Sequence, residues 1–259
     1  MIDRKRVTDT FYKYVDNYDQ KDGKVKLKID HTIRVAHLSE EIAKTLQLSK
    51  EDVDLAWLIG MLHDVGRFEQ LRQFGTFIDR ESIDHAKLGV SLLFDKGLIR
   101  DYVEDSKEDT IIRTAIDNHN VYILSDELEE RTLLFCNLIR DADKIDILKV
   151  NVEVPAKTVY GISEAEMQQA AITPEVMENY MAHRAVNHQL KKSSIDNIVG
   201  HASLVFELVF PKSVALVKEQ GYIDKTLCYQ SQNEETCKQL ERMHTEMQSY
   251  IQGVLGTNI

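Results

Sequence analysis

Apolar residues recur at steps of three and four along most of the chain, the spacing that places them on one face of an α-helix. Between residues 30 and 46 this stripe consists of Val35, Leu38, Ile42 and Leu46. The 259 residues include only 3 prolines and 11 glycines, so few positions interrupt a helix. The chain as a whole lacks the regular alternation of apolar and polar residues that is typical of half-buried β-strands. The sequence therefore predicts an all-α protein.

Residues that commonly cap helices predict where several of these helices begin and end. Ser49 is suited to the N-cap of the helix that contains "DLAWLIGMLHD", and Asp30 to the N-cap of the preceding helix. Gly66 is expected to end the helix that Ser49 starts, because glycine readily adopts the left-handed conformation found at helix C-termini. Thr173-Pro174 is expected to start a second group of helices, since proline is favoured in a first turn.

The helical pattern is interrupted in the middle of the chain, around Val154-Pro155 and again at Gly161. We therefore predict two parts. Residues 1–153 would form a helical core with an N-terminal segment, and residues 154–259 a C-terminal helical extension that packs on the core. The extension carries no motif that indicates a function.

The last predicted helix, over residues 234–255, is charged but has an apolar stripe along one face. The stripe consists of Leu240, Met243, Met247, Tyr250 and Ile251. We expect it to pack on its own domain, and a homodimer contact through this face is the alternative.

The charge balance restricts the partners of the chain. Its 43 acidic and 32 basic residues give a formal net charge of -11 and a pI of about 5.3. A phosphate backbone favours a basic surface, so a long nucleic acid is not expected as a partner, whereas a small phosphorylated ligand at a local metal site is compatible. No apolar stretch is long enough to cross a membrane, and the 3 cysteines show no disulfide framework. These features predict a cytoplasmic protein.

Four histidines fall on apolar faces, each near the end of a different predicted helix. They are His31, His63, His85 and His119. Ends of packed helices can meet at a shared cavity, where neutral imidazole nitrogens can ligate a divalent metal. A single histidine of this kind is more often a core residue, so the prediction depends on the set of four.

Carboxylates accompany the histidines in two places. Asp64 directly follows His63, and its two oxygens would allow it to bridge two ions. The segment "RDADKID" offers Asp141, Asp143 and Asp146 as a second anionic ligand. Both faces of this helix are apolar, so helical periodicity does not choose among the three.

The order of these residues resembles the signature of the HD-domain superfamily of metal-dependent phosphohydrolases. That signature is a histidine, a His-Asp pair and a distant aspartate, and a subset with two metals has two further histidines in between. The matching positions are His31, His63-Asp64, His85 in "IDHAKLG", His119 in "IDNHN" and Asp143 in "ADK". The resemblance covers about residues 25–150. It implies an all-α HD-domain helical bundle, with Asp143 rather than Asp141 as the distal ligand.

The resemblance implies a dinuclear site with Asp64 between two divalent ions. One ion would take His31, His63, Asp64 and Asp143, and the other His85, His119 and Asp64. Nitrogen and oxygen donors suit iron, manganese or zinc and do not select one of them. A water shared by two cations loses its proton near neutral pH and becomes a nucleophile. We therefore expect a phosphohydrolase that cleaves a phosphomonoester or phosphodiester, a nucleotide being one such substrate.

Two basic residues are candidates for binding the phosphate. Arg67 lies four positions after His63 and could bind a phosphate through two donors. The alternative is a surface arginine paired with Glu69 or another carboxylate. Lys144 flanks the distal aspartate and could bind an anion, and a salt bridge with Asp141 or Asp146 is the favoured alternative.

Two other functions are compatible with the same ligands. A minority of HD-like proteins use four histidines and two aspartates as a di-iron oxygenase, which needs two ions and open positions just as a hydrolase does. A nucleotide-sensing protein that keeps the site for structure is the second alternative. The intact ligand set favours an enzyme over this sensor.

Overall fold

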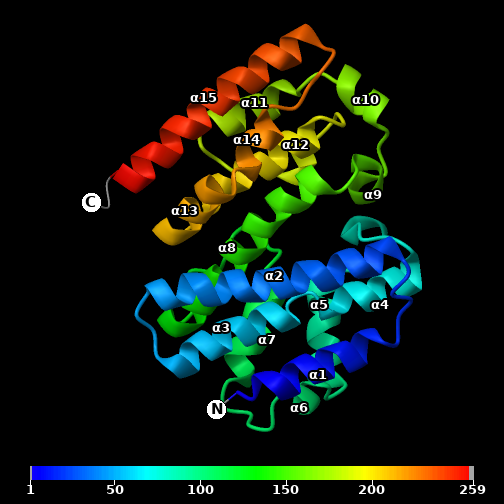
Figure 1. The fold of residues 1–259 in the computed structure, drawn as a ribbon, viewed down its shortest axis with the longest axis vertical. Coiled ribbons are helices and arrows are strands. Elements are labelled where there is room, and N and C mark those ends of the chain that lie inside the picture. The colour runs from blue at the N-terminus through cyan, green and yellow to red at the C-terminus, as the bar shows by residue number, and fades with distance from the viewer. Residues whose placement is uncertain (1, 257–259) are drawn as a thin grey trace. The chain divides into compact units, whose positions relative to one another are not determined.

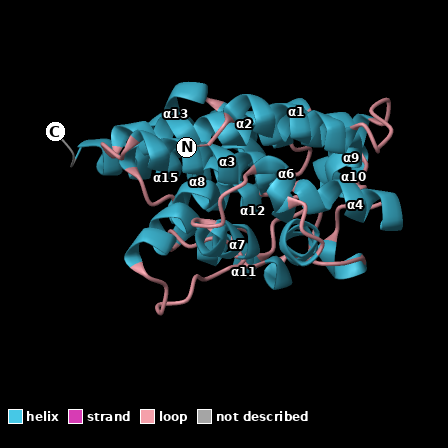
Figure 2. Cartoon of the chain, turned by 90° about the horizontal axis from the view of Figure 1, so that it is seen from below, coloured by secondary structure: helices cyan, strands magenta, loops and turns pink. Residues whose placement is uncertain are grey.

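The computed structural model describes residues 2–256, and this part of the chain consists of helices and loops without a strand (Figures 1 and 2). The prediction of an all-α protein is confirmed. None of the described helices is both long and apolar enough to span a membrane.

The chain divides into two compact units, Met1–Ala142 and Asp143–Ile259. The predicted boundary between residues 153 and 154 coincides with the end of helix α8 (Glu130–Glu153). The division instead falls inside α8, because one long helix contributes its first part to one unit and its second part to the other.

The first unit contains α1 to α7 and the first part of α8. Their bounds are α1 Arg4–Val15, α2 Gly23–Thr45, α3 Lys50–Leu62, α4 Val65–Phe74, α5 His85–Val90, α6 Ile99–Tyr102 and α7 Asp109–Asp117, with short turns at η1 Asp79–Glu81 and η2 Ser91–Asp95. The most extensive contact is between α2 and α3, which lie side by side (Figure 1). Helices α1 and α7 pack on α3, α4 packs on α2, and α5 packs on α4 and α7. This arrangement brings the ends of several helices to one region.

A glycine allows α2 and α3 to approach closely. A Cβ atom at Gly60 would lie 2.5 Å from the Cα of Ala36, closer than real Cβ atoms come to a backbone. Only a residue without a side chain therefore permits this contact. Gly60 lies one turn before His63 and Ala36 lies shortly after His31, so the close contact holds these two histidines near each other.

The predicted N-cap at Ser49 is confirmed at the start of α3, and the predicted helix start at Thr173-Pro174 is confirmed by α11 (Pro174–Met181). The Ser49 hydroxyl accepts a hydrogen bond from the backbone N–H of Asp52 at 3.1 Å. The predicted start at Asp30 is wrong, because α2 begins at Gly23, with Asp22 as its N-cap. Apolar and polar residues alternate over the first two turns of α2, "GKVKLKID", instead of following helical steps of three and four, so the apolar stripe did not reveal these turns.

The predicted helix end at Gly66 is also wrong. Helix α3 ends at Leu62, and Gly66 is the second residue of α4. Gly75, with a φ of 70°, provides the left-handed C-terminus of α4. Gly66 instead allows close packing, because a Cβ there would lie 2.2 Å from the carbonyl oxygen of His85.

Arg4 links α1 to both central helices. Its guanidinium contacts Glu40 of α2 at 3.0 Å and Asp54 of α3 at 2.7 Å. Lys44 also contacts Glu40, at 2.8 Å. Partial burial alone would raise the pKa of Glu40, but the Arg4 guanidinium and the Lys44 ammonium lower it to about 2.

We expect Glu40→Gln to destabilise the protein at pH 7 by about 1–2 kcal/mol, because charged hydrogen bonds to Arg4 and Lys44 are lost. The pKa of Glu40 is lower in the folded protein than its ordinary 4.5, so its stabilising effect is complete above pH 4.5 and decreases as pH falls toward 2. Urea unfolding of both proteins between pH 7 and pH 3 should show the difference shrinking. Glu127→Gln, at an exposed turn position, is the control. A difference independent of pH would contradict this origin.

The second unit contains the rest of α8 and seven further helices. These are α9 Ala156–Tyr160, α10 Glu164–Gln169, α11, α12 Asp196–Ala202, α13 Pro211–Gln220, α14 Tyr222–Leu227 and α15 Glu234–Gly256, with turns at η3 His188–Leu190 and η4 Ser203–Glu207. Helix α15 packs against α11, α13 and α14. Leu240, Met243, Met247 and Ile251 of its apolar stripe are buried. The stripe therefore packs within its own unit, as expected.

Candidate metal centre

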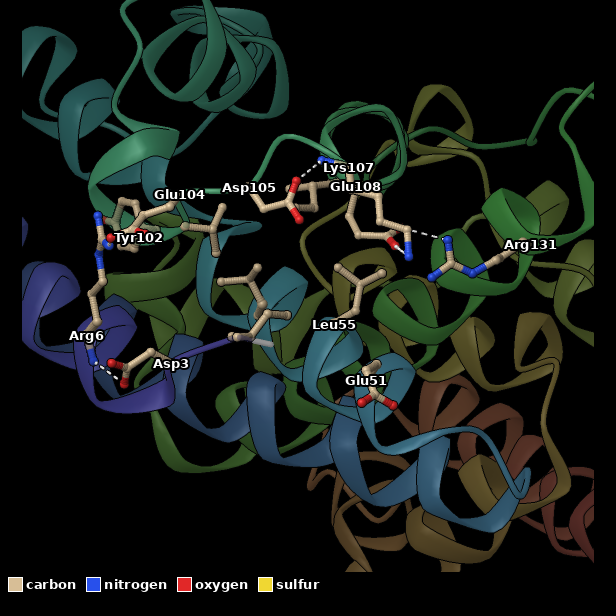
Figure 3. Close-up of a pocket in the computed structure, with 14 residues that line it drawn as sticks. Asp3, Arg6, Glu51, Leu55, Tyr102, Glu104, Asp105, Lys107, Glu108 and Arg131 are labelled. Carbon is tan, nitrogen blue, oxygen red and sulfur yellow. Dashed lines mark hydrogen bonds and ion pairs between the residues drawn. The ribbon is translucent and has the colours of Figure 1, made fainter.

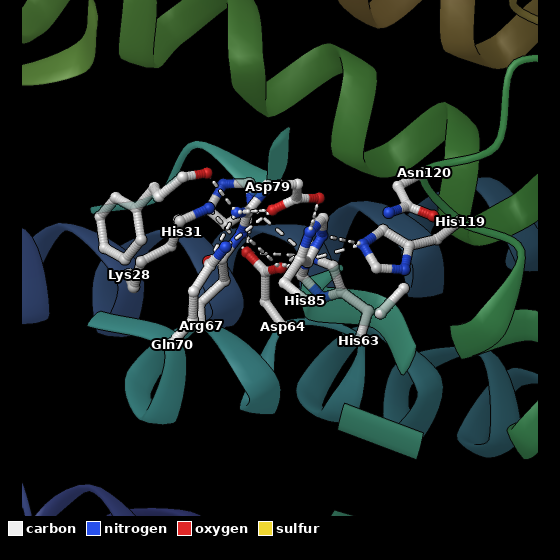
Figure 4. A network of polar contacts seen from close by, with 12 residues as sticks. Lys28, His31, His63, Asp64, Arg67, Gln70, Asp79, His85, His119 and Asn120 are labelled. Atoms are coloured by element: carbon white, nitrogen blue, oxygen red, sulfur yellow. Dashed lines mark hydrogen bonds and ion pairs between the residues drawn. The ribbon is translucent and has the colours of Figure 1, made fainter. Parts of the chain in front are cut away.

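The four predicted histidines and Asp64 converge in the first unit (Figure 4). His63 and Asp64 form the connection between α3 and α4, His85 is the first residue of α5, and His119 follows the end of α7. His31 lies within α2 rather than at its start, because α2 begins earlier than predicted. All five residues are at most 5 % exposed.

Asp64 lies between two pairs of histidines. Its Oδ2 atom lies 3.5 Å from Nε2 of His31 and 3.6 Å from Nε2 of His63. Its Oδ1 atom lies 3.5 Å from Nε2 of His85 and 3.8 Å from Nε2 of His119. Two groups that could each hold a metal ion therefore share one carboxylate.

Hydrogen bonds donated by Nδ1 determine which nitrogen of the His63 and His119 rings can act as a ligand. Nδ1 of His63 donates to the carbonyl oxygen of Gly60 at 2.8 Å, and Nδ1 of His119 donates to that of Ile116 at 2.7 Å. A carbonyl oxygen only accepts, so the hydrogen of each neutral ring is on Nδ1. The lone pair is then on Nε2, the atom that faces Asp64.

The same reasoning applies to His85, whose Nδ1 donates to Oδ2 of Asp79 at 2.6 Å. Burial, followed by the positive charge of Arg67, lowers the pKa of His85 to about 4, so its ring is neutral at pH 7. Its Nε2 lies 2.9 Å from Nε2 of His119, and the two lone pairs face each other. A cation between the rings would relieve this repulsion, so the donor set fits a divalent metal ion.

Asp64 is ionised despite its burial. Burial alone would raise its pKa, but the Lys28 ammonium, with Arg67 adding to its effect, holds the pKa well below its ordinary value. Nζ of Lys28 lies 2.7 Å from Oδ2, and Nε of Arg67 lies 3.6 Å from Oδ1. The charged carboxylate is the form that binds metal ions.

Arg67 is largely buried rather than at the surface, and it pairs with the carboxylates of Asp79 and Asp64, so the alternative of an arginine paired with another carboxylate holds in part. Its side chain is 15 % exposed, and its Nη1 donates to Gln70 at 2.8 Å, to the Phe77 carbonyl at 2.6 Å and to Asp79 at 2.8 Å. Its buried Nε has no hydrogen-bond partner among the described residues. Nη1 of the guanidinium is therefore held by the protein, and Nε lies 3.6 Å from Oδ1 of Asp64.

Two residues near the cluster were not predicted. Lys28 lies one helical turn before His31, and this spacing could have identified it as a neighbour on the same face. Asp79 lies in η1, after the loop that follows α4. No periodic pattern includes that loop, so no sequence signal indicated Asp79.

A comparison with protein-family models matches residues 29–148 to the HD domain. Residues 29–148 are an HD domain. The HD domain is an all-α fold typical of metal-dependent phosphohydrolases, so the predicted family and fold class are confirmed. Neither the curated proteins nor the solved structures contain a match to the chain.

The matched HD domain includes all six predicted ligand positions and both predicted phosphate-binding residues. Asp143 and Lys144 are the first residues of the second unit. Lys144 contacts Glu207 of η4 at 2.8 Å, a carboxylate far from it in sequence. The roles of Asp143 as a ligand and of Lys144 at the phosphate stay predictions.

The first unit also contains a cavity of about 470 Å³ apart from the histidine cluster (Figure 3). Its floor includes the buried side chain of Leu55, and charged residues surround it. Several of these charges pair with each other, Arg6 with Glu104 and Arg131 with Glu108. None of the residues that line the cavity belongs to the candidate metal centre.

Proposed function

We propose that the protein is a metal-dependent phosphohydrolase with two divalent ions bridged by Asp64. The observation that supports this most strongly is that each oxygen of Asp64 faces a different pair of histidine Nε2 atoms. His31 and His63 would hold one ion, together with Asp143 by the order of the family signature. His85 and His119 would hold the other. The donors suit iron, manganese or zinc.

The substrate of this proposal is a small phosphomonoester or phosphodiester, for example a nucleotide. When bound, two such ions supply Lewis-acid activation of a water molecule and of the phosphate oxygens. The net negative charge of the chain is compatible with a small phosphorylated substrate, because the positive charge that attracts it is local.

Residues of the chain prepare the site for that chemistry. Hydrogen bonds donated by Nδ1 orient three of the four imidazoles before any ion binds. Burial separates the ionised Asp64 from bulk water. Arg67 and Lys28 place two positive charges beside Asp64, where they can balance the charge of a phosphate. The buried Nε–H of Arg67 has no hydrogen-bond partner among the described residues, so a phosphate oxygen bound beside Asp64 could accept from it.

The proposal is tested by metal content and by hydrolysis of p-nitrophenyl phosphate and bis(p-nitrophenyl) phosphate with each of the three metals. We expect about two ions per chain and turnover of at least one ester. In His85→Ala the metal content should fall to about one, because one ion loses a ligand. His37→Ala is the control, since this α2 histidine has a side chain that is 66 % exposed.

The same experiments separate the alternatives. A folded, metal-loaded protein that hydrolyses neither ester contradicts the proposal. Oxygen consumption with a bound pair of iron ions would then favour the di-iron oxygenase. Retention of a nucleotide without turnover would favour a sensing protein.

A further inference from the structure

Asp79 contacts two parts of the candidate site at once (Figure 4). Its Oδ2 accepts the hydrogen bond from Nδ1 of His85 at 2.6 Å. Its Oδ1 accepts hydrogen bonds from Nη1 of Arg67 and from Nε2 of Gln70, both at 2.8 Å. The two oxygens of one carboxylate are therefore divided between a metal-ligand candidate and a phosphate-binding candidate.

The contact with His85 determines which ring nitrogen faces Asp64. A carboxylate only accepts hydrogen bonds, so it keeps the hydrogen of His85 on Nδ1 and leaves the lone pair on Nε2. Although burial alone would raise the pKa of Asp79, contacts with His85 and Arg67 lower it, so the carboxylate stays ionised.

The contact with Arg67 determines how the guanidinium is oriented. Asp79 shares Nη1 of Arg67 with Gln70 and with the carbonyl oxygen of Phe77. All three acceptors contact this one nitrogen of the guanidinium. Nε, which they do not contact, lies 3.6 Å from Oδ1 of Asp64.

We propose that Asp79 is a positioning residue that couples binding of the ion at His85 and His119 to binding of phosphate by Arg67. The proposal rests on the proposed function, because it assigns the second ion to His85. Asp79 itself need not contact either the ion or the substrate, since it acts through the two side chains that it holds.

An alternative role for Asp79 is as a ligand of a third ion, with Asp84 and His85. Asp84, however, is the N-cap of α5 and accepts from the backbone N–H groups of Ala86 at 3.0 Å and Lys87 at 3.2 Å. It also accepts from the amide of Asn120 at 3.1 Å. These three bonds all go to Oδ1 of Asp84, which is therefore used by the helix start and by Asn120. Both oxygens of Asp79 are already held by His85, Arg67 and Gln70, so the positioning role of Asp79 is favoured.

Asp79→Asn tests the proposal because an amide has one acceptor and one donor. It can accept from His85 or from Arg67, but it cannot accept from both. If its NH₂ group faces His85, the ring adopts the other tautomer and Nε2 carries the hydrogen, so it cannot bind a metal. We expect the affinity for the second of two Zn²⁺ or Mn²⁺ ions to fall by roughly 10–100-fold, with the first little changed.

Binding of inorganic phosphate to the metal-loaded protein should also weaken, by about tenfold, because Arg67 loses its orientation. Asp84→Asn is the matched control, since asparagine caps helices as well as aspartate does. It should retain both ions and phosphate binding. Asp79→Glu keeps a carboxylate and should restore part of the affinity for the second ion and for phosphate. If Asp79→Asn does not fold, Asp79→Glu is measured in its place.

The tautomer of His85 can be observed without any metal, from the ¹⁵N chemical shifts of its ring in the full chain after treatment with a chelator. If Asp79→Asn keeps the wild-type His85 tautomer, both ion affinities and phosphate binding, the proposal is overturned. If the wild type binds fewer than two ions, the proposed dinuclear function fails. The ¹⁵N shifts would then still decide whether Asp79 orients His85.

Discussion

Replacing Asp64 with asparagine should remove both metal ions and lower phosphate-ester hydrolysis by roughly a thousandfold or more. Both candidate ion sites depend on this one carboxylate, which faces His31 and His63 with one oxygen and His85 and His119 with the other. An uncharged amide offers a single oxygen and no charge to two cations. Loss of a single preorganised donor at a transition state already costs about 10²–10³-fold.

Elemental analysis and the two ester assays measure this prediction, with circular dichroism to verify folding. Asp30→Asn is the matched control, because this carboxylate is also in the first unit but is 45 % exposed and pairs with Lys26. The control should keep both ions and full activity. If Asp64→Asn retained two ions per chain, Asp64 would not be the bridging ligand, and the proposed site would be wrong.

The largest effect on stability is expected from Gly66→Ala. A Cβ at this position would lie 2.2 Å from the carbonyl oxygen of His85 and 2.7 Å from the backbone nitrogen of Gly89. Both atoms belong to the backbone of α5, so a side-chain rotation cannot relieve the collision, and α4 and α5 must separate. Overpacking typically costs about 1–3 kcal/mol, and we expect the upper end of this range.

Thermal unfolding should detect this as a fall in Tm of about 6–12 °C, given about 2–4 °C per kcal/mol for a chain of this size. The affinity for the ion at His85 and His119 should fall as well, because His85 is the first residue of the displaced helix. Gly23→Ala is the control, since a Cβ at Gly23 has no atom within 4 Å. An unchanged Tm for Gly66→Ala would show that the two helices are not in close backbone contact.

Several features of the metal centre could be predicted from the sequence because they depend on local spacing. The apolar stripes predicted helices, and they placed His85 and His119 on inward faces. The adjacent pair His63-Asp64 connects two helices, so both side chains point to the same region once those helices pack. The position of the four histidines near helix ends predicted that they converge, and the structure confirms this convergence around Asp64.

Other features were decided only by tertiary packing. The sequence predicted that Gly66 ends a helix, but in the folded chain this glycine allows the backbone of α5 to approach α4 closely. Lys28 joins the site because α2 lies beside Asp64, and Asp79 joins it because η1 lies beside His85. Periodicity within one segment reports which face is buried, but not which distant segment covers that face. The division of the Asp64 oxygens between two histidine pairs, and of the Asp79 oxygens between His85 and Arg67, therefore exists only in the folded chain.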